Sequence, residues 1–192
     1  MDNSDLEVAK MLNEHKTKAY GSLEEGVYIK EKLYEFERVS LFEDKFSIML
    51  PKDFVDMPEN IKKMKYLAEQ RPQIIKTIPT GGIDIGFSLL DAEIMNEQVL
   101  QHVVYARNAM KKINPSITVF HTDKMEDEEK TIAWMDFMNT GLDGGMYNIM
   151  YLIPIGGKTV HGIFNCSIYE REIWNPIQLE IMKSIKVDKV NR

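Results

Sequence analysis

The side chains that most often carry out acid–base chemistry are few in this sequence and far apart. No two of the four histidines have the spacing of metal ligands on one helix face or on adjacent strand positions; they are His15, His102, His121 and His161. A catalytic histidine needs a partner that positions it, so we interpret these side chains as surface or partly packed residues. We keep His161 as a candidate contact residue because it follows a predicted hairpin turn.

Motifs that mark known active sites are absent from the sequence. It has no G-x-x-x-x-G-K-[ST] phosphate loop, no G-x-S-x-G nucleophile elbow, no H-E-x-x-H metal pair and no C-x-x-C. Gly81, Gly82 and Gly86 lack the spacing of a dinucleotide-binding loop, and the segment continues into a strand pattern. We therefore predict that the protein is not an enzyme, and we expect no cofactor and no metal site.

Cys166 is the single cysteine, and it lies in an alternating apolar segment beside Phe164 and Ile168. We interpret it as a small core residue and not as a nucleophile. One cysteine cannot form an internal disulfide, which favours the reducing cytoplasm as the compartment. The acidic run from Asp123 to Glu129 lacks the spacing of a calcium loop, and we expect it to point into solvent.

Composition and charge exclude several classes of protein. A length of 192 residues, with 44% hydrophobic and 28% charged residues, fits a single globular domain. The formal net charge of −6 and the scarcity of arginine argue against a nucleic-acid partner. No basic segment followed by an apolar run begins the chain, and no stretch reaches the roughly 18 apolar residues of a membrane span. We expect neither export nor membrane insertion.

Hydrophobic periodicity predicts mostly β-structure in the first half of the chain. Residues 30–41 and 45–50 alternate as a hairpin around the turn Glu43-Asp44. A short helix is predicted over 60–68, followed by strands at 73–78 and 83–90 that are separated by a Pro-Thr-Gly-Gly turn.

Two longer helices are predicted, one over 95–113 and one near the C-terminus. The first has one apolar stripe, formed by Val99, Val103, Ala106, Met110 and Ile113. In the second, Asn175 is predicted to be the N-cap and Pro176 the first helical residue, with Gln178 completing a capping box. Trp174 and Leu179 would form the hydrophobic staple, and the inward stripe would be Ile177, Ile181 and Ile185.

Four strands between these helices, at 116–122, 131–140, 146–154 and 159–168, predict an antiparallel meander. Both of its faces are apolar: one carries Ala133, Met135, Phe137, Met150, Leu152 and Ile163, and the other carries Trp134, Met138, Ile149, Tyr151, Ile153, Val160 and Phe164. A sheet with two apolar faces must be covered on both sides. The predicted fold is therefore α+β, an antiparallel sheet with helices on both faces, or α/β/α sandwich.

Two-residue turns at Asp143-Gly144 and Gly156-Gly157 would place Asn139, Asn148 and Asn165 side by side across three strands. Three adjacent amides could bind a polar ligand or a peptide backbone, or they could satisfy one another. We favour the structural role and keep all three as candidate contact residues.

The domain is predicted to span residues 29–187. Residues 1–28 are polar with weak helical spacing and are interpreted as a loosely attached N-terminal arm or helix; residues 188–192 are interpreted as a frayed tail.

Three segments support a resemblance to a known family: 46–51 (Phe-Ser-Ile-Met-Leu-Pro), 157–162 (Gly-Lys-Thr-Val-His-Gly), and Trp174 through Ser184-Ile185. In these segments and in its order of elements, the chain resembles the PsbP-like α/β/α sandwich over residues 30–186. Relatives of that fold include a Ran-binding nuclear import factor and type VI secretion adaptor chaperones. The resemblance implies a domain that binds other proteins, and no family binding residue can be carried over.

Our first hypothesis is thus a non-catalytic protein-binding module, adaptor or chaperone-like, with an unidentified protein partner. Exposure of Met57, Met64 or Met125 would support it, because methionine suits adaptable binding surfaces. The alternative is a small-molecule binder or cryptic enzyme with a pocket between sheet and helix, using the asparagine row or Asp136 with Tyr151. A third hypothesis is a homodimer formed through a sheet edge.

Overall fold

The protein is described by a computed structural model that covers residues 20–66, 71–141 and 144–187. Its centre is a seven-stranded sheet in which every neighbouring pair of strands is antiparallel. In spatial order the strands are β6 (Val55–Asp56), β7 (Ile74–Thr77), β8 (Asp84–Leu90), β12 (Lys158–Ser167), β11 (Gly144–Ile155), β10 (Thr131–Gly141) and β9 (Thr118–Glu126).

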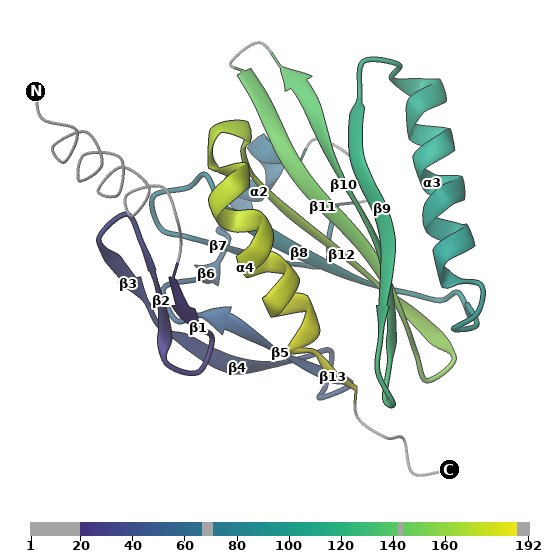
Figure 1. Cartoon of the computed structure of the whole chain (residues 1–192), viewed down its shortest axis with the longest axis horizontal. Helices are drawn as coiled ribbons and strands as arrows, with labels where there is room; N and C mark the ends of the chain where they lie inside the picture. Colours follow the sequence, from purple (N-terminus) through teal and green to yellow (C-terminus); the bar gives the residue numbers. More distant parts are fainter. Residues whose placement is uncertain (1–19, 67–70, 142–143, 188–192) are drawn as a thin grey trace, which may run out of the picture.

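Helices cover both faces of this sheet, as predicted (Figure 1). Helix α3 (Val99–Ile113) packs on one face with Ala133, Met135 and Phe137. Helix α4 (Arg171–Lys183) lies on the other face in the same core as Trp134, Tyr151 and Phe164. The α/β/α arrangement and the predicted division of the meander's two apolar faces between two helices are thereby confirmed.

Two smaller sheets complete the layer on the α4 side. The predicted hairpin is formed by β4 (Phe36–Leu41) and β5 (Phe46–Pro51), to which β13 (Lys186–Val187) adds beside β5. Phe46, Ile48 and Leu50 are almost fully buried in the core that contains α4. Alternation along β5 therefore points one face of this hairpin inward.

The other small sheet includes part of the expected N-terminal arm. It consists of β1 (Tyr20–Ser22), β2 (Gly26–Ile29) and β3 (Lys32–Tyr34). Leu23 and Val27 are buried in the α4-side core, so these residues of the arm pack against the rest of the molecule. Residues 1–19 of the arm, and the predicted tail at 188–192, lie outside the described residues.

The β10–β11 register differs from the predicted one. Asn139 is opposite Met146, and Asn148 is opposite Phe137, because the strands pair as far as Gly141 and Gly144. The β11–β12 register is as predicted, with Asn148 opposite Asn165. A Cβ placed on Gly145 would come within 2.9 Å of Met138 Sδ and 3.1 Å of Ile168 Cγ2, so a larger residue would crowd these side chains. A shift of two residues leaves every side chain on its predicted face.

Helix α4 begins earlier than its capping residues predict. It starts at Arg171 after a 3₁₀ turn (Ile168–Glu170), so Asn175 is not the N-cap and Pro176 lies inside the helix. An internal proline costs about 3 kcal/mol, whereas burying an Ile or a larger side chain contributes about 1.5–3 kcal/mol. Ile173 and Trp174 are both buried, so the longer helix is favoured. Gln178 is buried and not part of a capping box, and the inward stripe is confirmed.

Helix α3 starts at Val99 and covers the sheet with its first half. Val99 and Val103 are fully buried and Ala106 and Met110 partly so, whereas Ile113 is 86% exposed. The side chain of Ile113 in the last turn therefore does not pack on the sheet. Helix α2 (Glu59–Lys65) is the predicted short helix; it begins one residue earlier than expected and ends three residues earlier.

The ring of Tyr151 lies across Gly162 on the neighbouring strand, where a Cβ would come within 2.0 Å of the ring. We expect Gly162→Ala to lower the free energy of unfolding by about 1–3 kcal/mol, because the fully buried ring has no space to move. Urea unfolding of Gly162→Ala, Tyr151→Leu and the double variant measures this. In the double variant the alanine should cost less; strictly additive effects would contradict the contact.

Candidate binding groove and the polar networks of the sheet

The three asparagines lie on one face of the sheet, and they differ in their hydrogen bonds. Asn148 Nδ2 donates to the Met146 carbonyl at 3.0 Å, and Asn165 Nδ2 donates to the Tyr66 hydroxyl at 3.1 Å. The Oδ1 atom of Asn139 is buried and has no hydrogen-bond partner among the described residues. The row is thus staggered by the register shift, and one amide is left unsatisfied.

His161 is not brought to these amides. It lies four residues from Asn165 along β12, opposite Leu152 and Ser88. Four residues of strand separate the two by roughly 13 Å. Burial lowers the pKa of His161, because the interior disfavours the charged imidazolium. Its predicted role in contacts stays a prediction, separate from the asparagines.

Asn139 and Asn165 line a groove of about 740 Å³ at one end of the sheet. Its other walls are the turn from Thr80 to Gly82, the adjoining ends of β10, β11 and β12, and Lys65 of α2. We call this the asparagine groove. Asn148 does not line it.

A buried carboxylate holds α2 against the sheet beside this groove. Asp84, which is 1% exposed, accepts hydrogen bonds from Thr77 Oγ1 at 2.6 Å and from Lys65 Nζ at 3.0 Å. The Tyr66 hydroxyl lies 3.5 Å from the same carboxylate and also accepts from Asn165. Burial raises the pKa of Tyr66 to about 12. Charge-assisted hydrogen bonds of this kind are the stronger ones in proteins.

Helix α2 has no buried residue and leaves its apolar side chains in solvent. Met64 is 74% exposed and Ile61 is 36% exposed. Ile61 and Met64 are three residues apart and share one side of the helix, whereas Lys65 is the residue of α2 that lines the groove. Of the methionines considered in advance, Met64 is exposed, Met57 is buried and Met125 is partly buried. A seven-residue helix is marginal alone, so these polar contacts stabilise it.

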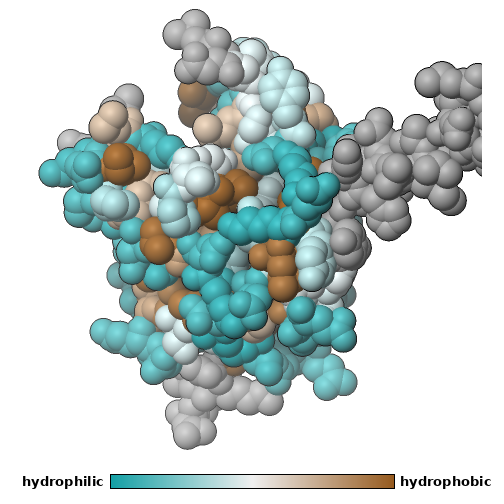
Figure 2. Space-filling view, turned by 90° about the vertical axis from the view of Figure 1, so that its left-hand side faces the viewer, coloured by the Kyte–Doolittle hydropathy of each residue, from teal (hydrophilic) through white to brown (hydrophobic). Residues whose placement is uncertain are grey.

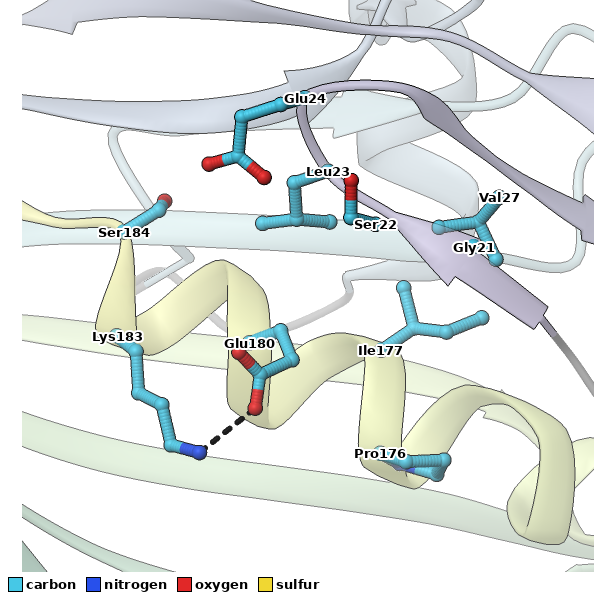
Figure 3. A pocket seen from close by; sticks show the side chains of 10 residues that line it. All are labelled: Gly21, Ser22, Leu23, Glu24, Val27, Pro176, Ile177, Glu180, Lys183 and Ser184. Carbon is cyan, nitrogen blue, oxygen red and sulfur yellow. Dashed lines mark hydrogen bonds and ion pairs between the residues drawn. The ribbon is translucent and has the colours of Figure 1, made fainter.

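A second groove, of about 450 Å³, separates the β1–β2 hairpin from α4 (Figure 3). Leu23, Val27 and Ile177 form its apolar lining, and Lys183 pairs with Glu180 at 2.6 Å on its rim. On this side of the molecule hydrophobic residues form small groups among hydrophilic ones (Figure 2). No buried polar atom without a partner is found among the described residues that line this second groove.

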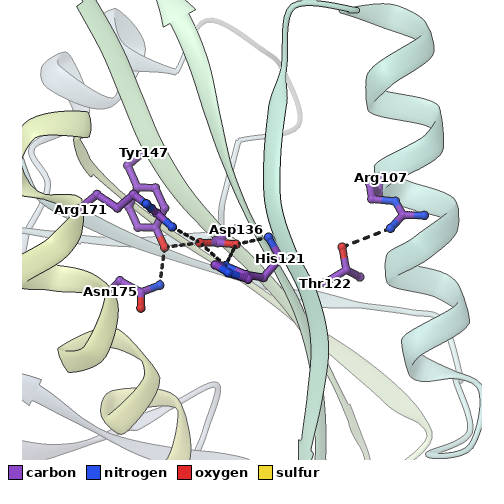
Figure 4. A network of polar contacts seen from close by, with 7 residues as sticks. All are labelled: Arg107, His121, Thr122, Asp136, Tyr147, Arg171 and Asn175. Carbon is purple, nitrogen blue, oxygen red and sulfur yellow. Dashed lines mark hydrogen bonds and ion pairs between the residues drawn. The ribbon is translucent and has the colours of Figure 1, made fainter.

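Another network surrounds Asp136 on the α4 side of the sheet (Figure 4). This fully buried carboxylate accepts from the His121 main-chain N–H at 2.7 Å and from the Tyr147 hydroxyl at 2.9 Å. His121 Nδ1 lies 3.0 Å from Oδ1, and Arg171 Nη2 lies 3.7 Å from Oδ2. Asn175 donates to the Tyr147 hydroxyl, so the network joins β9, β10, β11 and α4.

A β-bulge on β9 makes this arrangement possible. The β9–β10 register shifts between Asp136 and Phe137, so that an extra residue, Phe120, lies between Val119 and His121. A bulge turns side chains away from strict alternation. Phe120 and His121 consequently both reach the α4 side, where the Arg171 guanidinium lies 4.0 Å from the centre of the Phe120 ring.

An Asp–His pair is a familiar arrangement in catalysis, but a nucleophile must also lie within reach of the imidazole. Among the described residues, no serine, threonine or cysteine side chain bonds to His121. Cys166 is 1% exposed, and burial raises the pKa of its thiol to about 12. Its thiol is therefore neutral at physiological pH, which agrees with its interpretation as a core residue. The contacts of Asp136 connect β9, β10, β11 and α4.

Sequence reasoning associated Asp136 with Tyr151 and missed its actual partners. In the predicted register Tyr151 is opposite Asp136; in the structure Ile149 takes that place and Tyr147 is the diagonal neighbour. The hydroxyl of Tyr151 is buried and has no hydrogen-bond partner within the described part of the chain. His121 was missed because a bulge leaves no mark in the hydrophobic pattern. Asp84 and Lys65 were missed because a turn and a loop separate them in the sequence.

We expect Asp136→Ala to lower the free energy of unfolding by about 3 kcal/mol, because it leaves buried donors without an acceptor. His121→Ala serves as the control: its side chain is 60% exposed, and we expect a loss below about 1 kcal/mol. Urea unfolding at neutral pH measures both. Equal losses would show that the imidazole, and not the carboxylate, is the centre of the network.

We also expect stability to fall at alkaline pH, in part through Tyr66. Its pKa is 10.0 when unfolded and about 12 when folded, so the folded state keeps the proton longer. The stabilisation is complete below about pH 10 and is lost as the pH rises toward 12. Urea unfolding of wild type and Tyr66→Phe across this range should give a shallower decline for the variant. Parallel declines would contradict the assignment.

Comparison with solved structures identifies the fold of this chain. No protein-family model matches it, and no curated protein sequence matches it. Among solved structures, it is similar to cyanobacterial PsbP (CyanoP) from Synechocystis, with a TM-score of 0.61 and 9% identity over 80% of this chain and 92% of that one. The Ran-binding protein Mog1p of Saccharomyces cerevisiae gives a TM-score of 0.54 and 12% identity over 80% and 96%.

LpqN, involved in cell envelope biogenesis of Mycobacterium tuberculosis, gives a TM-score of 0.53 and 12% identity over 84% of this chain and 95% of that one. At these identities the likeness concerns the fold alone, and the resemblance to the PsbP-like fold is confirmed. Within the described part of the chain, no helix is long and apolar enough to cross a membrane.

Proposed function

We propose that this chain, which has the PsbP-like fold, is a non-catalytic protein-binding module of the cytoplasm, adaptor or chaperone-like, that binds a protein partner at α2 and the asparagine groove. The observation that carries the proposal is the exposure of Met64 and Ile61 on a helix that buries none of its residues. Methionine is unbranched and polarisable, so it adapts to differently shaped partners. An exposed pair of this kind beside a groove is typical of a docking surface.

Two further features support this proposal. Lys65 of α2 lines the groove, so a partner bound in the groove also contacts this helix. Among proteins of the same fold, Mog1p is named as Ran-binding, which shows that this architecture can present a protein-binding surface. The groove also has a volume within the range of small-molecule sites, and this favours a small polar ligand as the second candidate.

Affinity capture with variants of the tagged full-length protein tests the proposal. Met64→Glu should reduce recovery of a specific partner from a lysate of the source cells by about tenfold or more, because a charge would enter an apolar contact. Ile113→Glu is the matched control, since Ile113 is an apolar residue of α3 that is 86% exposed and does not line the groove. Both substitutions are at exposed sites, so each should change the free energy of unfolding by less than about 0.5 kcal/mol.

Three outcomes are informative. Loss with Met64→Glu and retention with Ile113→Glu would support binding at α2. Equal recovery with all three proteins would contradict this surface. Recovery of the protein alone would count against a protein-binding function and favour the small-ligand candidate.

A further inference from the structure

We infer that Met64 is a site of reversible oxidation, at which a hydroperoxide converts the thioether to a sulfoxide and thereby releases the partner bound at α2. The inference rests on the proposed protein-binding function and adds a means of regulating that same surface. It is carried by the exposure of Met64, by the attachment of α2 to the sheet, and by the burial of the single cysteine.

Solvent access divides the methionines of this protein into two groups. Among the described residues three are exposed: Met64 at 74%, Met95 at 55% and Met146 at 48%. The other described methionines are partly or fully buried, and Met135 and Met182 are 0% exposed. An oxidant must touch the sulfur, so the rate of oxidation follows exposure. A hydroperoxide in solution therefore reaches Met64 before the methionines of the core.

Two of the three exposed methionines border the proposed docking surface. Met64 precedes Lys65, which lines the asparagine groove, and Met146 lines the groove itself. Met95 precedes α3 and lines neither this groove nor the one beside α4. Met64 is the most exposed of the three and provides the proposed contact, so an added oxygen there has the largest effect on binding.

The single thiol of the chain does not compete for the oxidant. Cys166 is the only cysteine, it is 1% exposed, and burial raises the pKa of its thiol to about 12. Hydroperoxides react with the thiolate, and a buried neutral thiol does not supply one. Within the described part of the chain, the exposed thioethers are therefore the groups that take up a peroxide oxygen reversibly.

Oxidation of Met64 is compatible with the intact fold. Helix α2 buries none of its residues, and it is attached through Lys65, which donates to the buried carboxylate of Asp84 at 3.0 Å. The Met64 side chain is mostly in solvent and contributes little to packing. A sulfoxide at this position stays hydrated in the free protein, so the change acts on binding and not on folding.

The reaction is a two-electron oxidation of sulfur. A sulfur lone pair attacks one oxygen of the hydroperoxide, the O–O bond breaks, and the other oxygen leaves as an alcohol or, from hydrogen peroxide, as water. The polar sulfoxide then occupies an apolar contact, and burying it without a hydrogen-bond donor opposes binding. Methionine sulfoxide reductases reverse the change: two thiols become a disulfide and the oxygen leaves as water.

Hydrogen peroxide treatment of the full-length protein, followed by peptide mass spectrometry, tests the selectivity. We expect the sulfoxide to form at Met64 at least about tenfold faster than at Met135 or Met182. Urea unfolding of the protein oxidised at Met64 should give the midpoint of the untreated protein. Equal rates at Met64 and the two core methionines would overturn the inference, as would unfolding on oxidation of Met64.

Affinity capture measures the effect on binding to the partner that Met64→Glu loses. The tagged protein is oxidised and freed of peroxide before it meets the lysate, and recovery after oxidation is divided by recovery before it. We expect this ratio to be about one tenth for wild type and for Met95→Leu, the matched control. For Met64→Leu, which has no sulfur at this position, the ratio should stay near one. Methionine sulfoxide reductases acting on both epimers should restore recovery by wild type.

The outcomes distinguish this inference from the proposed function. Equal recovery by oxidised and reduced wild type, of a partner that Met64→Glu loses, would keep the docking surface and reject regulation by oxidation. An equal fall for Met64→Leu and wild type would assign the effect to another methionine and also reject the inference. Recovery of no partner by reduced wild type would reject both.

Discussion

A seven-stranded sheet that is apolar on both faces imposes the arrangement of the rest of this molecule. Along β10, Ala133, Met135 and Phe137 point to one side and Trp134 to the other, and all four are buried. Each face must be covered, because apolar surface left in water costs about 25 cal/mol per Å². Helix α3 covers one face; α4 and the two small sheets share the other.

Unequal coverage of the two faces explains where a binding surface can form. The α4 side contains the larger core, with contributions from β2, β5 and α4. On the α3 side the buried cluster consists of nine residues and is confined to α3, the segments that flank it and the middle of the meander. The asparagines on that face lie toward the strand ends, beyond this cluster, and the short α2 is attached there through polar contacts. The asparagine groove opens at these strand ends, beside Lys65 of α2.

Two buried carboxylates attach peripheral elements to the sheet. Asp136 joins the bulged edge strand β9 to α4, and Asp84 joins α2 to β7 and β12 through Tyr66 and Asn165. A buried carboxylate is tolerated only with several donors, so each position requires its neighbours to take defined orientations. Such contacts add specificity to a sheet whose apolar faces by themselves would tolerate alternative packing.

Much of this protein follows from its sequence. Period-two alternation determined the strands and the face of each side chain, and the three-and-four spacing determined α3 and the inward stripe of α4, because these patterns are local consequences of backbone geometry. The sandwich followed from the two apolar faces of the meander. Only the tertiary structure decided the β10–β11 register, because a shift of two residues leaves the alternation of side chains unchanged. It also decided the early start of α4, where burial of Ile173 and Trp174 outweighs an internal proline. The asparagine groove, the partners of Asp84 and Asp136, and the exposed side of α2 join residues distant in sequence, and no local pattern encodes such contacts.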